Sequence, residues 1–134
     1  MIPPSAQTLI SVAMLSEVRQ RLGREADDFI LSVGERIGAA CSFDFNGGLE
    51  PFAAAMNDIW AELGFGRAVL SMQSGALLIR HQLPQDGQDT SVWEDTLPLL
   101  VEGVYRGWFR HFSTHGTLSR ISASGSELEF IFSE

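Results

Sequence analysis

The chain has 134 residues, of which 45% are hydrophobic and 19% charged, a composition typical of a folded domain rather than a disordered segment. It carries 17 acidic residues against 9 arginines, with no lysine, for a net charge of -8. A nucleic-acid-binding surface needs cationic residues that displace counterions from phosphates, and binding to an anionic membrane needs a polybasic patch, so we expect neither partner.

Three helices are predicted in the first half of the chain. The first begins after residues 3–5 and ends at Gly23, the second covers residues 25–40, and the third covers residues 50–63. The second helix is expected to bury its large apolar side chains, namely Phe29, Ile30, Val33, Ile37 and Cys41. Gly34 and Gly38 lie one turn apart in it, although each glycine weakens a helix by about 1 kcal/mol. We therefore expect another helix to approach closely along that side.

Two hairpins and a long helix are predicted to follow. Alternating apolar residues indicate strands at residues 67–72, 76–83, 118–123 and 127–133. The alternation puts Leu77, Ile79, His81 and Leu83 on one face of the second strand, and Leu128, Phe130 and Phe132 on the core face of the last. Between the hairpins, Ser91 and Glu94 form a capping box that begins a long amphipathic helix. Its aromatic stripe, Trp93, Trp108, Phe109 and Phe112, repeats at helical spacing and is expected in the core. Pro98 lies inside this helix, so we expect a kink in its first turns or a delayed start of its regular part. The element order predicts an α+β fold, in which a four-stranded antiparallel sheet packs against helices in one domain over residues 1–134.

The residues capable of chemistry do not form a catalytic pattern. His111 and His115 are expected to meet the negative end of the long helix, because a zinc site would need a third ligand. His81 belongs to the apolar face of a strand, which predicts a buried structural histidine. Cys41 continues an apolar stripe, which predicts a buried small side chain. We therefore expect no enzyme activity, no cofactor and no metal site.

The beginning of the sequence lacks the basic segment and continuous apolar run of a secretory signal. No segment reaches the roughly 20 apolar residues of a membrane span, so we expect no membrane insertion. Cys41 is the only cysteine, so no disulfide can form within the chain. These features predict a cytoplasmic protein, with the periplasm left open.

One set of residues is similar to the motifs of a known family, the cellulose synthase operon protein D family. The similarity covers a tryptophan in the third helix, a strand ending in histidine and a Leu-Pro-Gln turn, and a helix with a proline followed by Glu-Gly, tyrosine and tryptophan. The residues concerned are Trp60, His81, Leu83, Pro84, Trp93, Pro98, Glu102, Gly103, Tyr105 and Trp108. The chain departs from the family pattern in its shorter N-terminus, in extra residues between Trp93 and Glu102, and in a shorter loop after Gly87.

The resemblance implies a non-catalytic accessory protein of the synthase whose dimers assemble into a cylindrical octamer. Such an octamer associates with the cellulose synthase and organises the enzyme or its nascent glucan chains into crystalline fibrils during glucan export and biofilm formation. The implied partners are copies of the chain itself, other components of the cellulose synthase complex, a proline-rich protein of the same operon, and glucan. In the family the N-terminal segments line internal passageways, so the glucan-passage candidates are Ile2, Pro3, Pro4, Ser5 and Gln7.

Two other classes of protein are compatible with this composition and order of elements. An acidic, dimeric type III secretion chaperone would also combine helices with a sheet, although it would begin with one helix rather than three. A ligand-sensing domain would hold a cofactor between helices and sheet, with His81 or His111 as an axial haem ligand. An octamer supports the cellulose interpretation, a stable dimer supports the chaperone, and visible absorbance supports the sensor.

Overall fold

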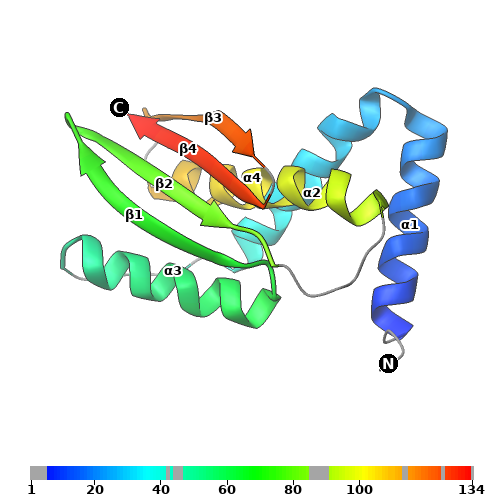
Figure 1. Ribbon diagram of the computed structural model, residues 1–134, viewed down its shortest axis with the longest axis horizontal. Helices are drawn as coiled ribbons and strands as arrows, with labels where there is room; N and C mark the ends of the chain where they lie inside the picture. Colours follow the sequence, from blue (N-terminus) through cyan, green and yellow to red (C-terminus); the bar gives the residue numbers. More distant parts are fainter. Residues whose placement is uncertain are drawn as a thin grey trace.

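The computed structural model describes residues 6–41, 43, 47–84, 91–112, 115–124 and 126–133, with side chains for all of these except 6–12, 91–95 and 124. Three helices come first, then a hairpin, a long helix and a second hairpin (Figure 1). The elements are α1 (Ala6–Leu22), α2 (Glu25–Ala40), α3 (Leu49–Leu63), β1 (Arg67–Gln73), β2 (Ala76–Gln82), α4 (Ser91–Phe112), β3 (Thr117–Ser124) and β4 (Glu127–Ser133). The predicted α+β class and the order of the elements are confirmed.

The four strands form one antiparallel sheet in the order β1-β2-β4-β3. The two hairpins therefore meet through their second strands, with Ile79 of β2 opposite Phe130 of β4. Strands β1 and β3 are the two edges, and β3 carries a register shift between Arg120 and Ser122. Figure 1 shows α3 running beside β1, while α1 lies at the end of the molecule away from the β1–β2 turn.

The core lies between one face of the sheet and helices α3 and α4. The predicted inward faces of β2 and β4 are correct, since Ile79 and Phe130 are fully buried and their strand neighbours Arg80 and Glu129 are not. The buried hydrophobic core consists of Phe52, Met56, Trp60, Ala68, Leu77, Ile79, Leu83, Leu97, Val101, Val104, Tyr105, Trp108, Phe109, Leu128 and Phe130. The aromatic residues Trp108 and Phe109 are therefore core residues, as their helical spacing predicts.

Helix α2 packs closely against α4 along a line of glycines. A Cβ added to Gly34 would lie 2.5 Å from the carbonyl oxygen of Leu100, and one added to Gly103 would lie 2.3 Å from that of Leu31. Gly38 and Gly107 are equally crowded, so two pairs of glycines let the helix backbones touch. The predicted close approach of another helix is confirmed, and that helix is α4.

The buried face of α2 agrees with the predicted one at Ile30 and differs from it at Phe29. It consists of Ala26, Ile30, Gly34 and Gly38, whereas Phe29 is 46% exposed. A helix that approaches this closely leaves no space for a phenylalanine along the line of contact, so glycine occupies that line, while Ile30 is buried one turn before Gly34. Cys41 is also not buried as predicted: it is the half-buried C-cap of α2, where its N–H bonds to the carbonyl of Ile37.

Helix α4 is continuous from Ser91 to Phe112, so the delayed start expected at Pro98 is absent. Proline removes one backbone hydrogen bond of the helix. The adjacent Thr96 and Leu97 are buried, and their packing holds this turn in place. The predicted capping box of Ser91 and Glu94 lies outside the described side chains.

Candidate functional site

Four of the residues singled out in the sequence meet in the centre of the molecule. Trp60 comes from α3, His81 from β2, and Tyr105 and Trp108 from successive turns of α4, and all four side chains are fully buried. The Trp60 ring centroid lies 4.6 Å from that of His81, 5.1 Å from that of Tyr105 and 4.9 Å from that of Trp108, each in an edge-to-face arrangement. We call these four residues the motif core.

Both ring nitrogens of His81 have partners. Nε2 lies 2.8 Å from the carbonyl oxygen of Phe65, and Nδ1 lies 2.7 Å from the hydroxyl oxygen of Tyr105. A carbonyl can only accept, so Nε2 carries the proton, and in a neutral ring Nδ1 accepts from the Tyr105 hydroxyl. His81 therefore links β2 to α4 and to the turn between α3 and β1.

Burial keeps both partners of this pair neutral. Desolvation lowers the pKa of His81 from 6.5 to about 4, although the bond to the Phe65 carbonyl opposes the change. Desolvation also raises the pKa of Tyr105 well above 10. At neutral pH a neutral imidazole with both nitrogens occupied has no free lone pair to bind a metal or accept a substrate proton. The pair of His81 and Tyr105 is thus suited to a structural role, in which it links β2 to α4.

The turn that supplies the Phe65 carbonyl is itself constrained by glycine. Gly64 ends α3 in the left-handed conformation. Gly66 has a φ of +109°, and a Cβ there would lie 3.0 Å from Nε2 of His81 and still closer to the carbonyl oxygen of Gln82. Only glycine brings this turn close enough to the buried histidine.

The indole nitrogens of Trp60 and Trp108 are buried and have no hydrogen-bond partner among the described residues. Their surroundings are aromatic rings, with Trp108 edge-on to Tyr105 at 5.7 Å. Aromatic rings surround both indoles, so the stability of the motif core depends on the volume and shape of these side chains.

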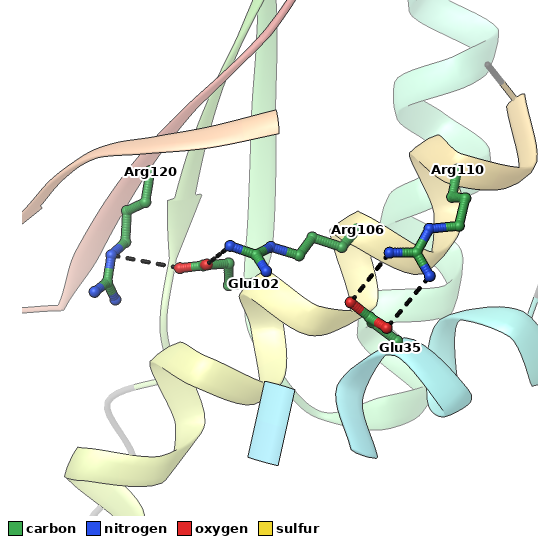
Figure 2. A network of polar contacts seen from close by, with 5 residues as sticks. All are labelled: Glu35, Glu102, Arg106, Arg110 and Arg120. Atoms are coloured by element: carbon green, nitrogen blue, oxygen red, sulfur yellow. Dashed lines mark hydrogen bonds and ion pairs between the residues drawn. The ribbon is translucent and has the colours of Figure 1, made fainter. Parts of the chain in front are cut away.

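Glu102 and Gly103, the next two motif residues, lie on other sides of α4. Gly103 lies in the contact with α2. The Glu102 side chain is only 9% exposed and lies 2.8 Å from Arg106, one turn along α4, and 3.5 Å from Arg120 of β3. Figure 2 shows Glu102 between these two arginines, and a second pair, Arg110 with Glu35 of α2. The polar side of α4 is thus tied to both β3 and α2.

The other predicted site residues are less informative. Leu83 is buried, and its N–H bonds to the carbonyl of Ser126 at 2.7 Å, whereas Pro84 is half-buried. Trp93 belongs to α4, but its side chain lies outside the described part of the chain. The passage candidates Ile2, Pro3, Pro4 and Ser5 lie outside the described residues, and so does the side chain of Gln7, whose backbone is in α1.

The remaining histidines do not form a site. His111 is exposed in the last turn of α4, which agrees with the predicted interaction with the negative helix end, and His115 lies beyond the end of the helix. In the described part of the chain, no three histidine, cysteine or acidic side chains lie close enough to hold a metal ion. Within the same ranges, no helix combines the length and apolar character needed to cross a bilayer.

Sequence reasoning placed His81 in the core but did not find its partner. His81 and Tyr105 are 24 residues apart, and only the packing of α4 on the sheet brings them together. A signal for the pair is nevertheless present, because a buried polar residue on an apolar strand face requires a partner, and Tyr105 brings a hydroxyl group on the apolar stripe of the neighbouring helix. The contact between Glu102 and Arg120 was missed for the same reason.

A solved structure from a study of how protein-induced porphyrin distortion modulates heme redox potential has the same fold. It is 10% identical in sequence, with a TM-score of 0.64, and the alignment covers 99% of this chain and 78% of that one. At this identity the likeness shows the fold alone. The residues here do not fit a heme site of the kind considered from the sequence, since both nitrogens of His81 are hydrogen-bonded and His111 is on the surface.

No curated protein matches the sequence. The family model for the D subunit of cellulose synthase matches residues 7–129, which include the motif core, the first three strands and nearly all of the four helices. This match favours the cellulose interpretation over the secretion chaperone. The chain belongs to the family of cellulose synthase D subunits, which has an accessory role in cellulose synthesis.

Proposed function

We propose that this chain is a non-catalytic component of the synthase complex that assembles from dimers into a cylindrical octamer. The octamer organises the cellulose synthase and its nascent glucan chains for the formation of crystalline fibrils, on the cytoplasmic side of the membrane. The observation that carries the proposal is the family match over residues 7–129.

The position of the motif residues supports a structural role. A catalytic motif places polar side chains together at an accessible cleft. Here Trp60, His81, Tyr105 and Trp108 fill the core, and the two groups with shifted pKa values, His81 and Tyr105, satisfy each other. The motif residues thus stabilise the folded core of a single protomer.

The described surface supports self-association. Large apolar side chains are exposed on α1, on α2 and on both edge strands: Met14 (64%), Val69 (60%), Met72 (58%), Ile121 (51%) and Phe29 (46%). Isolated exposed apolar residues are common, but several on different sides of a small protein fit a protomer with more than one contact surface. The net charge of -8 keeps such a particle soluble.

The first test is the absolute mass of the purified protein, measured by light scattering behind a sizing column. The proposal expects about eight times the 14.7 kDa of one chain. A stable monomer or dimer at all concentrations would contradict the octamer. Deletion of the gene, followed by X-ray diffraction of the cellulose produced, then tests the role in fibril order, which should fall while synthase activity in isolated membranes is retained.

The passage candidates call for a separate test. Deletion of residues 2–5 should leave the particle mass unchanged and reduce the crystallinity of the cellulose produced, if these residues contact glucan. The control is Gln20→Ala, which changes an exposed residue of α1 at the far end from the passage candidates. Equal crystallinity for the deletion, the control and the unmodified protein would remove these residues from the proposal.

A further inference from the structure

The two edges of the sheet are protected differently. Strand β3 has a register shift between Arg120 and Ser122, and the Arg120 side chain reaches inward to Glu102. Irregular backbone and inward-pointing charge are known devices against pairing with another strand. Strand β1 has neither, although α3 runs beside it: its register with β2 is unbroken from Arg67 to Gln73, and after Arg67 it contains no charged residue and no proline.

Asn57 of α3 shows which backbone groups of β1 point outward. Its carboxamide accepts from the N–H of Ala68 at 2.8 Å and donates to the carbonyl of Ala68 at 2.9 Å. In an antiparallel ladder, the N–H and C=O of one residue point to the same side and alternate from residue to residue. The outward groups of β1 therefore belong to Ala68, Leu70 and Met72.

Asn57 satisfies the first of these residues and leaves the other two open. In the part of the chain that the structure describes, the outward N–H and C=O groups of Leu70 and Met72 have no hydrogen-bond partner. The Met72 side chain is 58% exposed, and Val69 on the opposite face of the strand is 60% exposed. The open stretch thus combines four backbone groups with apolar side chains on both faces.

We propose that β1 pairs in antiparallel fashion with β1 of a second copy of the chain, about a two-fold axis at Ser71. This register uses all four open groups: Leu70 exchanges both hydrogen bonds with Met72 of the second copy, and Met72 with Leu70. A register centred on Leu70 instead would require the groups of Ala68 that Asn57 already occupies. The inference rests on the proposed self-assembly and assigns one of its interfaces, at which two sheets join into one.

Disulfide cross-linking tests the register. Ser71 would face Ser71 of the second copy in a non-hydrogen-bonded pair, with a Cα separation of about 4.5 Å, which suits a disulfide. In a Cys41→Ser background, Ser71→Cys should give a covalent dimer under mild oxidation. The control is Val69→Cys, on the same face of β1 as Ser71. In this register residue 69 lies opposite Gln73 of the second copy, about 13 Å from residue 69 of that copy. Equal cross-linking of both variants, or of neither, would overturn the register.

A charged residue on the edge tests the interface itself. Met72→Lys should reduce the particle mass by about a factor of two or more, whereas Ser119→Lys, at an exposed site on the protected edge strand β3, should leave it unchanged. Circular dichroism should show that both variants are folded. Assembly that survives Met72→Lys, with no Ser71→Cys dimer, would overturn the β1 interface and leave the proposed function standing. An unmodified protein that is monomeric would instead remove both.

Discussion

The two sides of α4 hold the molecule together in opposite ways. The side facing α3 and the sheet presents two of the largest side chains in the chain, Tyr105 and Trp108, both fully buried. The side facing α2 presents Gly103 and Gly107, where an added Cβ would lie 2.3 Å and 2.7 Å from backbone oxygens of α2. The first contact depends on side-chain volume, and the second depends on its absence.

The difference predicts opposite sensitivities. On the aromatic side, removal of atoms leaves a cavity that the neighbouring rings fill only in part. On the glycine side, addition of a single methyl group meets main chain, which cannot move aside as a flexible side chain can. A substitution that removes volume and one that adds it should therefore both destabilise, each on its own side of the same helix.

The largest effect is expected for Trp60→Ala, which empties the centre of the motif core. Loss of a fully buried tryptophan should lower the free energy of unfolding by roughly 3–5 kcal/mol. Phe29→Ala is the control, since Phe29 is also aromatic but 46% exposed, and it should cost much less. Urea unfolding at pH 7 measures both. Similar losses for the two variants would show that the aromatic side does not depend on buried volume.

Acid should weaken the aromatic side through His81. Between pH 6.5 and about 4 the unfolded chain protonates this histidine while the folded protein keeps it neutral, so stability falls as the pH decreases. The whole effect is on the order of 3 kcal/mol and is absent above pH 6.5, where both states are neutral. His81→Gln removes the titrating group, so its stability should change less over this range. Urea unfolding at several pH values gives the two slopes, and equal slopes would rule out His81 as their source.

On the glycine side, Gly103→Ala should destabilise by roughly 1–3 kcal/mol, because its Cβ would lie 2.3 Å from the carbonyl oxygen of Leu31. In an open helix the same change would stabilise by about 1 kcal/mol, so the sign of the effect is the test. Ser32→Ala, on the exposed face of α2, is the control and should be neutral or slightly stabilising. A stabilised Gly103→Ala variant would mean that the backbones of α2 and α4 are too far apart to touch.

Periodicity was enough to predict the elements, the inward faces of β2 and β4, and the aromatic stripe of α4. It was only partly right on α2, where Ile30 is fully buried as predicted but Phe29 is 46% exposed. The pattern of apolar residues measures how much each side chain gains from burial, but not how close the neighbouring helix lies. Gly34 and Gly38 carried that second signal, and they predicted the contact correctly.

The candidate site was predictable as a set of residues but not as an arrangement. The motif marked Trp60, His81, Tyr105 and Trp108, yet nothing in their spacing stated that the hydroxyl of Tyr105 meets Nδ1 of His81. Such a contact depends on the crossing of α4 over the sheet, which local sequence does not encode. The same holds for the capping of Ala68 by Asn57, which is visible only once α3 lies beside β1.

The smallest effect is expected from the ion pairs on the polar side of α4, between its aromatic and glycine sides. Glu102 is nearly buried between Arg106 and Arg120, whereas the pair of Arg110 and Glu35 joins groups at 3.4 Å, with the arginine 69% exposed. Water and salt screen the second pair more strongly. Glu102→Gln should therefore lower the free energy of unfolding by about 1 kcal/mol, and Glu35→Gln by less than about 0.5 kcal/mol.

Urea unfolding in low salt and in about 1 M NaCl separates the two variants, because added salt should erase the effect of Glu35→Gln first. A larger loss of unfolding free energy for Glu35→Gln would mean that the contact between α4 and α2 depends on the ion pair as well as on the close approach of the two backbones at glycine.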